Sequence, residues 1–321
     1  MTESFEKINY SLRPAKSIER KMMCEAFRRL SAFGKVDLYS YIGFGSTYFS
    51  DFSLFHKTLN IQNMTSIEKS TDKQERFKFN TPFRCVQMKF GTSTEILPSL
   101  NENSRKIIWL DYDGMLSSDV LLDIKTSCSK VQSGSIIIVS VNANPISNGT
   151  IDIEDLPDFR LNRLISAVGK NKVPAGTKGK DFAKWGTAKV CREIINNEIS
   201  STITDINGAR EDGSKLCYEQ LFNFHYSDNA KMLTVGGVIY DEGQAHLLSQ
   251  CSFDDLPFIT KENTPYHIEV PNLTFKEIRA LDEQLPKKDG ETLALPSVSQ
   301  EDIEKYEKIY RFFPTFTEAN L

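Results

Sequence analysis

The feature that most constrains the fold of this chain is a regular alternation of short apolar runs with segments of helical spacing. Five runs are strand-like, at residues 36–42, 64–68, 83–91, 106–114 and 133–145. Between the second and third runs, Thr71 and Gln74 have the spacing of a helix-capping box. Strands that alternate with helices predict a parallel, doubly wound α/β sheet.

Residues 215–242 depart from this alternation, because two strand-like runs follow each other directly around a turn at Ser227–Ala230. This pattern predicts an antiparallel hairpin. We therefore expect a Rossmann-like, mostly parallel seven-stranded sheet that ends in an antiparallel hairpin. Helical spacing at residues 14–33, 274–286 and 302–313 predicts helical extensions at both ends.

We expect one domain over residues 1–321. Its core would span about 36–240, with an insertion at about 145–185, where Pro, Gly, Asp and Lys occur with little periodicity, and a C-terminal helical extension at about 241–321.

Composition excludes several function classes. Acidic residues outnumber basic ones by 43 to 39, so no overall positive field attracts nucleic acid or an anionic membrane. The six cysteines form no CxxC unit and the four histidines are scattered, which disfavours a zinc site and predicts reduced, mostly buried thiols. The polar N-terminus matches no signal or transit peptide, and no apolar run is long enough to span a membrane. We expect a cytoplasmic location.

Two glycines directly after the first predicted strand are the first candidate site. Gly43 and Gly45 flank Phe44 and are followed by Ser46 and a short predicted helix. A glycine pair at this position allows a sharp turn and the close approach of a ligand, and in a doubly wound sheet cofactors bind at this turn. A plain tight turn explains the same two glycines.

Glu68 ends the second predicted strand, roughly 20 residues after the glycines, as a ribose-binding carboxylate would. The alternative is a solvated acid paired with Lys69 or Lys73. The nicotinamide fingerprint requires a third glycine where Tyr48 stands, so a nicotinamide oxidoreductase is disfavoured.

From residue 36 to 240 the order of elements resembles the class I S-adenosylmethionine-dependent methyltransferases. The segments "FGTSTEILPSL" (90–100) and "IIWLDYDG" (107–114) resemble the third-strand exit and the fourth strand of small-molecule O-methyltransferases. The resemblance implies S-adenosylmethionine as the cofactor and methyl transfer to an oxygen or nitrogen acceptor. It places residues 43–46 at the methionine end, Glu68 at the ribose and Asp111 beside the methyl group. The adenine would be flanked by Gly91, Thr92 and Ser93.

Two departures from the family pattern support an alternative function. The acid that usually precedes the glycines is replaced by Tyr39, Ser40 and Tyr41, and the third glycine of its motif by Thr47. Asp51, further along, could supply the missing carboxylate. The alternative is a catalytically lapsed protein of this fold that acts as a binding or regulatory subunit of a larger assembly.

Asp111 and Asp113 are the candidate catalytic residues. Residues two apart on an extended chain point to the same side, here toward the expected ligand crevice. Either carboxylate could accept a proton from the acceptor. With Asn142 or Asn144 they could also ligate magnesium, but the carboxylate pattern does not match that of metal-dependent relatives, so we predict no metal. A turn at Asp113–Gly114 is the structural alternative.

Partners are less constrained, and the methyl acceptor is not identified by any motif. Residues 169–189 hold six lysines, one acid and Trp185, so a contact with nucleic acid is one interpretation of this segment. A solvated loop is the alternative and the commoner outcome. The aromatic segment 310–316 in the C-terminal extension is a candidate surface for a protein partner.

Overall fold

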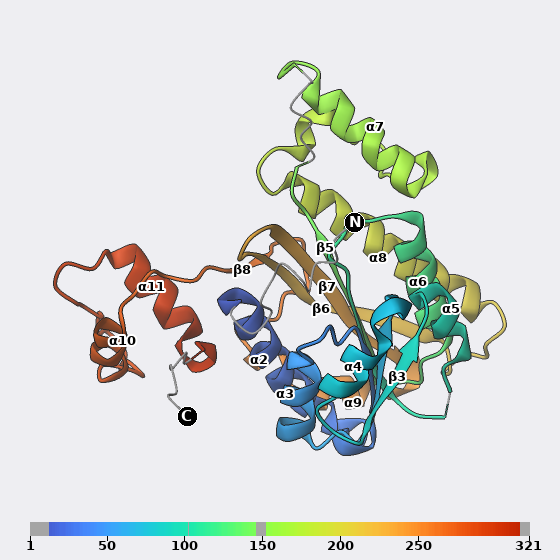
Figure 1. Ribbon diagram of the computed structural model, residues 1–321, viewed down its shortest axis with the longest axis horizontal. Coiled ribbons are helices and arrows are strands. Elements are labelled where there is room, and N and C mark those ends of the chain that lie inside the picture. The colour runs from blue at the N-terminus through green and yellow to red at the C-terminus, as the bar shows by residue number, and fades with distance from the viewer. Residues whose placement is uncertain (1–12, 102, 146–151, 315–321) are drawn as a thin grey trace.

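The computed structural model describes residues 13–101, 103–145 and 152–314, and shows one large sheet covered by helices on both faces (Figure 1). The sheet order is β3-β2-β1-β4-β5-β7-β6-β8. The first five strands are parallel, β7 runs antiparallel to β5 and β6, and β8 pairs parallel to β6. The strands are β1 (Ser40–Gly43), β2 (Asn63–Glu68), β3 (Val86–Phe90), β4 (Lys106–Asp111), β5 (Ser135–Asn142), β6 (Leu216–Ser227), β7 (Lys231–Asp241) and β8 (Tyr266–Ile268).

Alternate residues of the central strands enter different hydrophobic clusters, as the period of a β-strand requires. Ile136 and Ile138 of β5 belong to the cluster formed with α2, α3 and α9, whereas Ile137 and Val139 belong to the cluster formed with α6, α7 and α8. The helices are α2 (Pro14–Arg29), α3 (Ser50–Leu59), α4 (Gln74–Asn80), α5 (Ser93–Ile96), α6 (Ser118–Ser129), α7 (Leu156–Val168), α8 (Gly186–Asn207), α9 (Ala245–Gln250), α10 (Phe275–Asp282) and α11 (Gln300–Ile309).

The predicted fold class is confirmed, including the hairpin whose turn lies between Ser227 and Lys231. Three details differ from prediction. The sheet has an eighth strand, β8, which is only three residues long and carries no alternation that a sequence pattern could detect. β1 is shorter than expected, because residues 36–38 form a 3-10 turn. The insertion contains the 13-residue helix α7, in which Pro157 is the second residue.

The two predicted C-terminal helices, α10 and α11, form a lobe that projects from one side of the sheet (Figure 1). Leu281, Leu293, Ile303 and Tyr306 make a small separate core there. Ile309 and Phe312 pack into the main core, where the ring centroids of Phe312 and Phe258 lie 5.6 Å apart. Residues 146–151 of the insertion and 315–321 of the extension lie outside the described residues, and so does the end of the aromatic segment 310–316.

All six cysteines are free, and Cys24, Cys128, Cys191 and Cys251 are buried. Within the described ranges, every helix is too short or too polar to cross a bilayer.

Phe27 of α2 provides a test of how the N-terminal helix is held. Its ring is fully buried and lies 5.3 Å from the ring of Phe55 in α3 and 6.3 Å from that of Phe222 in β6. We expect Phe27→Ala to lower the free energy of unfolding by about 3–5 kcal/mol, since it leaves a cavity where three elements meet. Urea unfolding would measure this loss. Phe79→Ala, at a ring that is 88% exposed, should change it little, and equal losses would contradict the packing.

Candidate functional site

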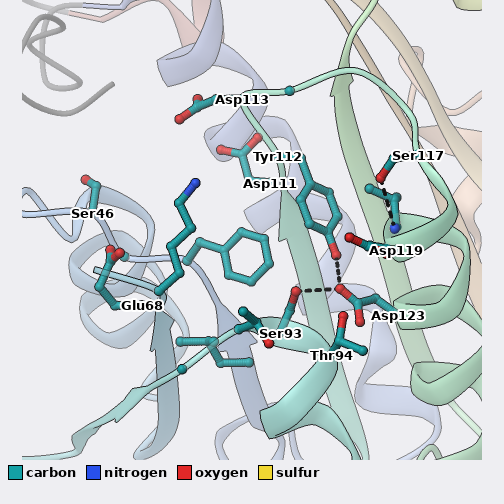
Figure 2. Close-up of a pocket in the computed structure, with 18 of the residues that line it drawn as sticks. Ser46, Glu68, Ser93, Thr94, Asp111, Tyr112, Asp113, Ser117, Asp119 and Asp123 are labelled. Carbon is teal, nitrogen blue, oxygen red and sulfur yellow. Dashed lines mark hydrogen bonds between the residues drawn. The ribbon is translucent and has the colours of Figure 1, made fainter. Parts of the chain in front are cut away.

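A cavity of about 640 Å³ lies at the carboxyl ends of the parallel strands. Drug-sized ligands and cofactors occupy cavities of this size, and in open α/β sheets such ligands bind at this edge. Figure 2 shows Ser46 and Glu68 on one side of the cavity and Ser93, Tyr112 and Asp123 on the other. The wall comes from α2, from the turns after β1, β2, β3 and β4, and from the starts of the helices that follow them. The lining residues are Arg20 in α2; Phe44, Gly45, Ser46, Ser50 and Asp51 after β1; Ile67, Glu68 and Lys69 at the end of β2; Gly91 to Thr94 after β3; and Asp111 to Met115, Ser117, Asp119, Val120 and Asp123 at and after the end of β4.

The sequence-predicted residues meet at this cavity with one exception. Those that line it are Phe44, Gly45, Ser46, Glu68, Gly91, Thr92, Ser93, Asp111 and Asp113. Gly43 is not among the lining residues, because it is the last, buried residue of β1. Four separate turns thus converge on one space, although the residues are spread over 70 positions of the sequence.

For the two glycines, the packing supports the alternative of a plain tight turn. A Cβ at Gly43 would lie 2.6 Å from the hydroxyl oxygen of Tyr41, and one at Gly45 would lie 2.5 Å from the ring of Phe49. These contacts are with the protein's own aromatic side chains rather than with space for a ligand. The glycines therefore let the turn after β1 pack tightly, and this packing leaves the backbone of Gly45 and Ser46 at the cavity wall.

Glu68 lies beside this turn, since β1 and β2 are paired in parallel. The amide of Gly45 donates to Oγ of Ser66 at 3.1 Å, which ties the turn to β2 two residues before the carboxylate. Oε1 of Glu68 accepts a hydrogen bond from the amide of Ser70 at 2.9 Å, which fixes its orientation.

Asp123 of α6 organises the opposite wall (Figure 2). Its Oδ2 accepts hydrogen bonds from the hydroxyl of Ser93 and, at 2.6 Å, from that of Tyr112. Burial and the Asp123 charge raise the pKa of Tyr112 above its ordinary value, so the phenol stays protonated and keeps donating. Asp123 is not among the sequence-predicted residues, because nothing in α6 indicates which of its acids turns toward α5 and the turn after β4.

Asp111 is held by a buried lysine that is also absent from the sequence-predicted residues. Nζ of Lys16, in α2, lies 2.7 Å from Oδ1 of Asp111, 2.9 Å from Oε2 of Glu19 and 3.0 Å from the hydroxyl of Tyr226. The same ammonium lies 4.3 Å from the ring centroid of Trp109, within cation–π range. The sequence does carry a signal for this cluster. Lys16, Glu19 and Met23 have the spacing i, i+3 and i+7, so two charged residues share one helix face with an apolar residue.

The Lys16 contact sets the charge of Asp111. Burial tends to raise the pKa of Asp111, but the Lys16 ammonium outweighs it and holds the pKa below the ordinary value. Burial tends to lower the pKa of Lys16, and the carboxylates of Asp111 and Glu19 outweigh this as well, so the pKa of Lys16 is raised. Asp111 is therefore a carboxylate at neutral pH and a weak proton acceptor.

Arg20 and Asp51 complete the end of the cavity near Asp111. Arg20 is 7% exposed and lines the cavity, and within the described residues its buried Nε has no hydrogen-bond partner. Asp51, also 7% exposed, accepts a short hydrogen bond from the hydroxyl of Tyr41. Burial raises the pKa of Asp51, while the nearby Arg20 guanidinium acts to lower it. A carboxylate thus lies beside the strand position where the sequence has Tyr41 in place of an acid.

The two asparagines considered as magnesium ligands accept hydrogen bonds from backbone amides. Oδ1 of Asn142 accepts from the amide of Asn144 at 2.9 Å, and Oδ1 of Asn144 accepts from the amide of Lys231 at 3.0 Å. These amides stabilise the loop after β5. In the part of the chain that the structure describes, no group of three or more His, Cys, Asp or Glu is arranged to hold a metal ion.

Comparison with known proteins gives a family match over almost the whole chain. Residues 8–321 match the model of a family described as "Putative O-methyltransferase". No curated protein matches the sequence.

Solved structures resemble the chain at low sequence identity. The complex of Trm1 from Pyrococcus horikoshii with S-adenosyl-L-methionine has a TM-score of 0.46 and 10% identity, over 83% of this chain and 67% of that one. Cofactor-bound Rv0187 from MTB has a TM-score of 0.35 and 10% identity, over 71% and 89%. The LepI complex with SAM has a TM-score of 0.34 and 11% identity, over 62% and 43%, so this chain spans less than half of LepI.

The Lys16 contacts lead to a pH-dependent prediction. We expect Lys16→Met to lower the free energy of unfolding by about 3–5 kcal/mol at pH 7, because it leaves the carboxylate of Asp111 without its cation. Since the folded-state pKa of Asp111 is depressed, its contribution is present above the unfolded pKa of about 3.9 and is lost as pH falls through the folded value. The difference between the two proteins should therefore persist down to about pH 4 and shrink below it.

Urea unfolding at pH 7 and at about pH 2.5 would check this. Lys125→Met, at an exposed lysine of α6, serves as the control and should have little effect at either pH. An equal loss for Lys16→Met at both pH values would mean that only packing was removed and would contradict the electrostatic account.

Proposed function

The chain belongs to the family described as "Putative O-methyltransferase", and from this premise we propose that it transfers the methyl group of S-adenosylmethionine to an oxygen or nitrogen atom of an acceptor. The observation that carries the proposal is the single cavity at which the turn after β1, Glu68 and Asp111 meet. This cavity combines a ribose-binding candidate with an ionised carboxylate at the carboxyl edge of a parallel sheet.

The residues present fit this cofactor group by group. Glu68 at the end of β2 supplies the acceptor that ribose hydroxyls need. The buried Nε of Arg20, which has no partner among the described residues, is a donor for the methionine carboxylate. Ser93, Thr94 and the Tyr112 ring form the wall on which the adenine would lie.

Bound there, S-adenosylmethionine would supply a methyl group on a positively charged sulfur, open to in-line attack by the acceptor's lone pair. The chain's own contribution is orientation and charge. Asp111, kept ionised by Lys16, provides fixed negative charge at this end of the cavity. Because its pKa is low, Asp111 is not the group that receives the acceptor's proton. Asp113, on the exposed rim, is the carboxylate we assign to that role.

Asp51 bears on the alternative of a catalytically lapsed protein. That alternative drew support from the missing acid before the glycines. Asp51 reaches the hydroxyl of Tyr41 from α3 and lines the same cavity, so the chain has a carboxylate in this region from another element. This placement favours retained cofactor binding over a purely regulatory role.

Calorimetry with S-adenosylmethionine tests the proposal. We expect saturable binding by the wild-type protein and binding weakened at least about tenfold by Glu68→Ala, because a carboxylate hydrogen bond contributes about 1.5–3 kcal/mol. Glu75→Ala, at an exposed acid of α4, is the matched control and should bind as the wild type does. Absence of any heat of binding would refute the methyltransferase function and leave the regulatory alternative.

Arg20 gives a sharper test of how the cofactor lies. We expect Arg20→Gln to weaken the binding of S-adenosylmethionine about tenfold or more, since it removes the charge assigned to the methionine carboxylate. Binding of 5′-methylthioadenosine, which has no carboxylate, should change much less, whereas Glu68→Ala should weaken both ligands. Thermal unfolding would check that each variant is folded. Equal weakening of both ligands by Arg20→Gln would contradict the assignment of Arg20 to the methionine carboxylate.

A further inference from the structure

A second polar cluster lies on the same edge of the sheet as the cavity, beyond β5. The amide of Asn142 donates at 2.9 Å to the carbonyl of Gly114, which lines the cavity. The next amide, of Ala143, donates at 2.8 Å to the carbonyl of Lys231 at the start of β7. The cluster lies at β6, three strands from β4 in the sheet order, or about 14 Å away at ordinary strand spacing.

Three rings form the centre of this cluster. The ring of Trp185 stacks on that of His225, with centroids 4.8 Å apart and planes 21° apart. His267 of β8 packs edge-on, 5.2 Å from His225 and 5.7 Å from Trp185. Nζ of Lys231 lies 5.2 Å from the Trp185 centroid. Trp185 is half-buried and covers His225, whereas the side chain of His267 is exposed.

Polar atoms in this cluster lack partners. His225 is 1% exposed, and neither of its ring nitrogens has a hydrogen-bond partner within the described residues. The same holds for Oγ1 of Thr187, which is 2% exposed, and for Oδ1 of Asn223, two residues from His225 on β6. A neutral imidazole has one donor and one acceptor, and leaving buried polar atoms unpaired costs about 1–3 kcal/mol each. Such a group of atoms is suited to receiving a polar ligand.

The charges around the cluster favour an anion. Burial, together with the positive charges of His267, Lys189 and Arg192, lowers the pKa of His225 to about 3. Burial lowers the pKa of His267, while Glu269 acts to raise it and Lys189 acts to lower it. The 22-residue helix α8 starts directly after Trp185, with no acid in its first turn and no side-chain cap, so its amide end attracts negative charge.

From these contacts we propose that Trp185, Thr187, Lys189, His225, Lys231 and His267 form a binding site for a phosphoryl group. Lys189, Lys231 and His267 would contact the phosphoryl oxygens. A shift of the Trp185 ring would bring a donor nitrogen of His225 within reach. Lys184, directly before this ring, has a left-handed backbone with φ of 54°, a conformation that lysine seldom adopts.

The position of the site suggests what carries the phosphoryl group. If the methyl acceptor lies beside Asp111, its phosphoryl group would lie about 14 Å away along the carboxyl edge. This assignment to the acceptor rests on the proposed function, whereas the phosphoryl site itself does not. A phosphorylated small molecule and a nucleic acid strand present the same group, and the experiment below distinguishes them.

Tryptophan fluorescence of the full-length protein provides the test. The chain has two tryptophans, and Trp109 is 1% exposed in the core, so a change on titration with inorganic phosphate reports on Trp185. We expect a saturable change in the wild type. Lys189→Gln should weaken it at least about tenfold, as loss of a charge-assisted hydrogen bond predicts. His225→Phe, which keeps a ring for stacking but removes both nitrogens, should do the same.

Lys170→Gln is the matched control, because it removes an exposed charge from the same lysine-rich segment and should leave the affinity unchanged. Sodium chloride at equal ionic strength should produce no saturable change. Absence of a saturable response to phosphate, or equal affinity in all variants, would overturn the site. If thermal unfolding shows that His225→Phe is not folded, the phosphate affinity of Lys189→Gln alone tests the site.

Two further measurements separate this inference from the proposed function. Binding of a single-stranded oligonucleotide with the same dependence on Lys189 would assign the phosphoryl group to nucleic acid. Binding of phosphate without binding of the oligonucleotide would assign it to a small molecule. Phosphate binding in a protein that does not bind S-adenosylmethionine would refute the methyltransferase proposal and leave the site standing. Binding of S-adenosylmethionine without binding of phosphate would refute the phosphoryl site and leave the methyltransferase proposal standing.

Discussion

The ion cluster around Lys16 is the interaction on which the arrangement of the cavity depends. One buried ammonium contacts Asp111 of β4, Glu19 of its own helix and Tyr226 of β6, so it joins α2 to two strands. The start of α2 is held as well, because the amides of Ala15 and Lys16 donate to the carboxylate of Asp228 in the hairpin turn. Buried ion pairs add little net stability over apolar packing, but removing one partner is costly. The cluster therefore fixes position and charge more than it adds stability.

That fixed position has consequences for the chemistry. With α2 in place, Arg20 reaches the cavity wall and Asp111 remains ionised. The cavity itself follows from the strand order, because β1 lies between β2 and β4 and the chain leaves these strands in opposite directions along the sheet. The tight turn after β1, packed on Tyr41 and Phe49, keeps the backbone of Gly45 at the rim.

Much of the fold could be predicted because its signals are local. Apolar runs, the capping box at Thr274 and the hairpin turn are all encoded within a few residues, and all three occur in the structure. The capping box expected at Thr71 and Gln74 does not form, because Thr71 lies in a 3-10 turn and α4 begins at Gln74 without a side-chain cap. The missed elements lacked such signals or were masked by their surroundings: β8 has three residues, and α7 lies in a segment rich in Pro, Gly and charge. The convergence of residues near 45, 68, 92 and 111 was also predictable, since parallel strands share one carboxyl edge.

By itself, the sequence determined the layered α/β architecture, the edge at which polar residues gather and the candidates Glu68 and Asp111, because periodicity and strand ends are properties of contiguous residues. Only the tertiary structure decided the charge of Asp111, the presence of Arg20 at the cavity and the meeting of Trp185 with His225 and His267. Lys16 is 95 residues from Asp111 and 210 from Tyr226, and pairings at such separations are set by how helices dock on the sheet. Burial then changes the energies of those groups, which no local pattern records.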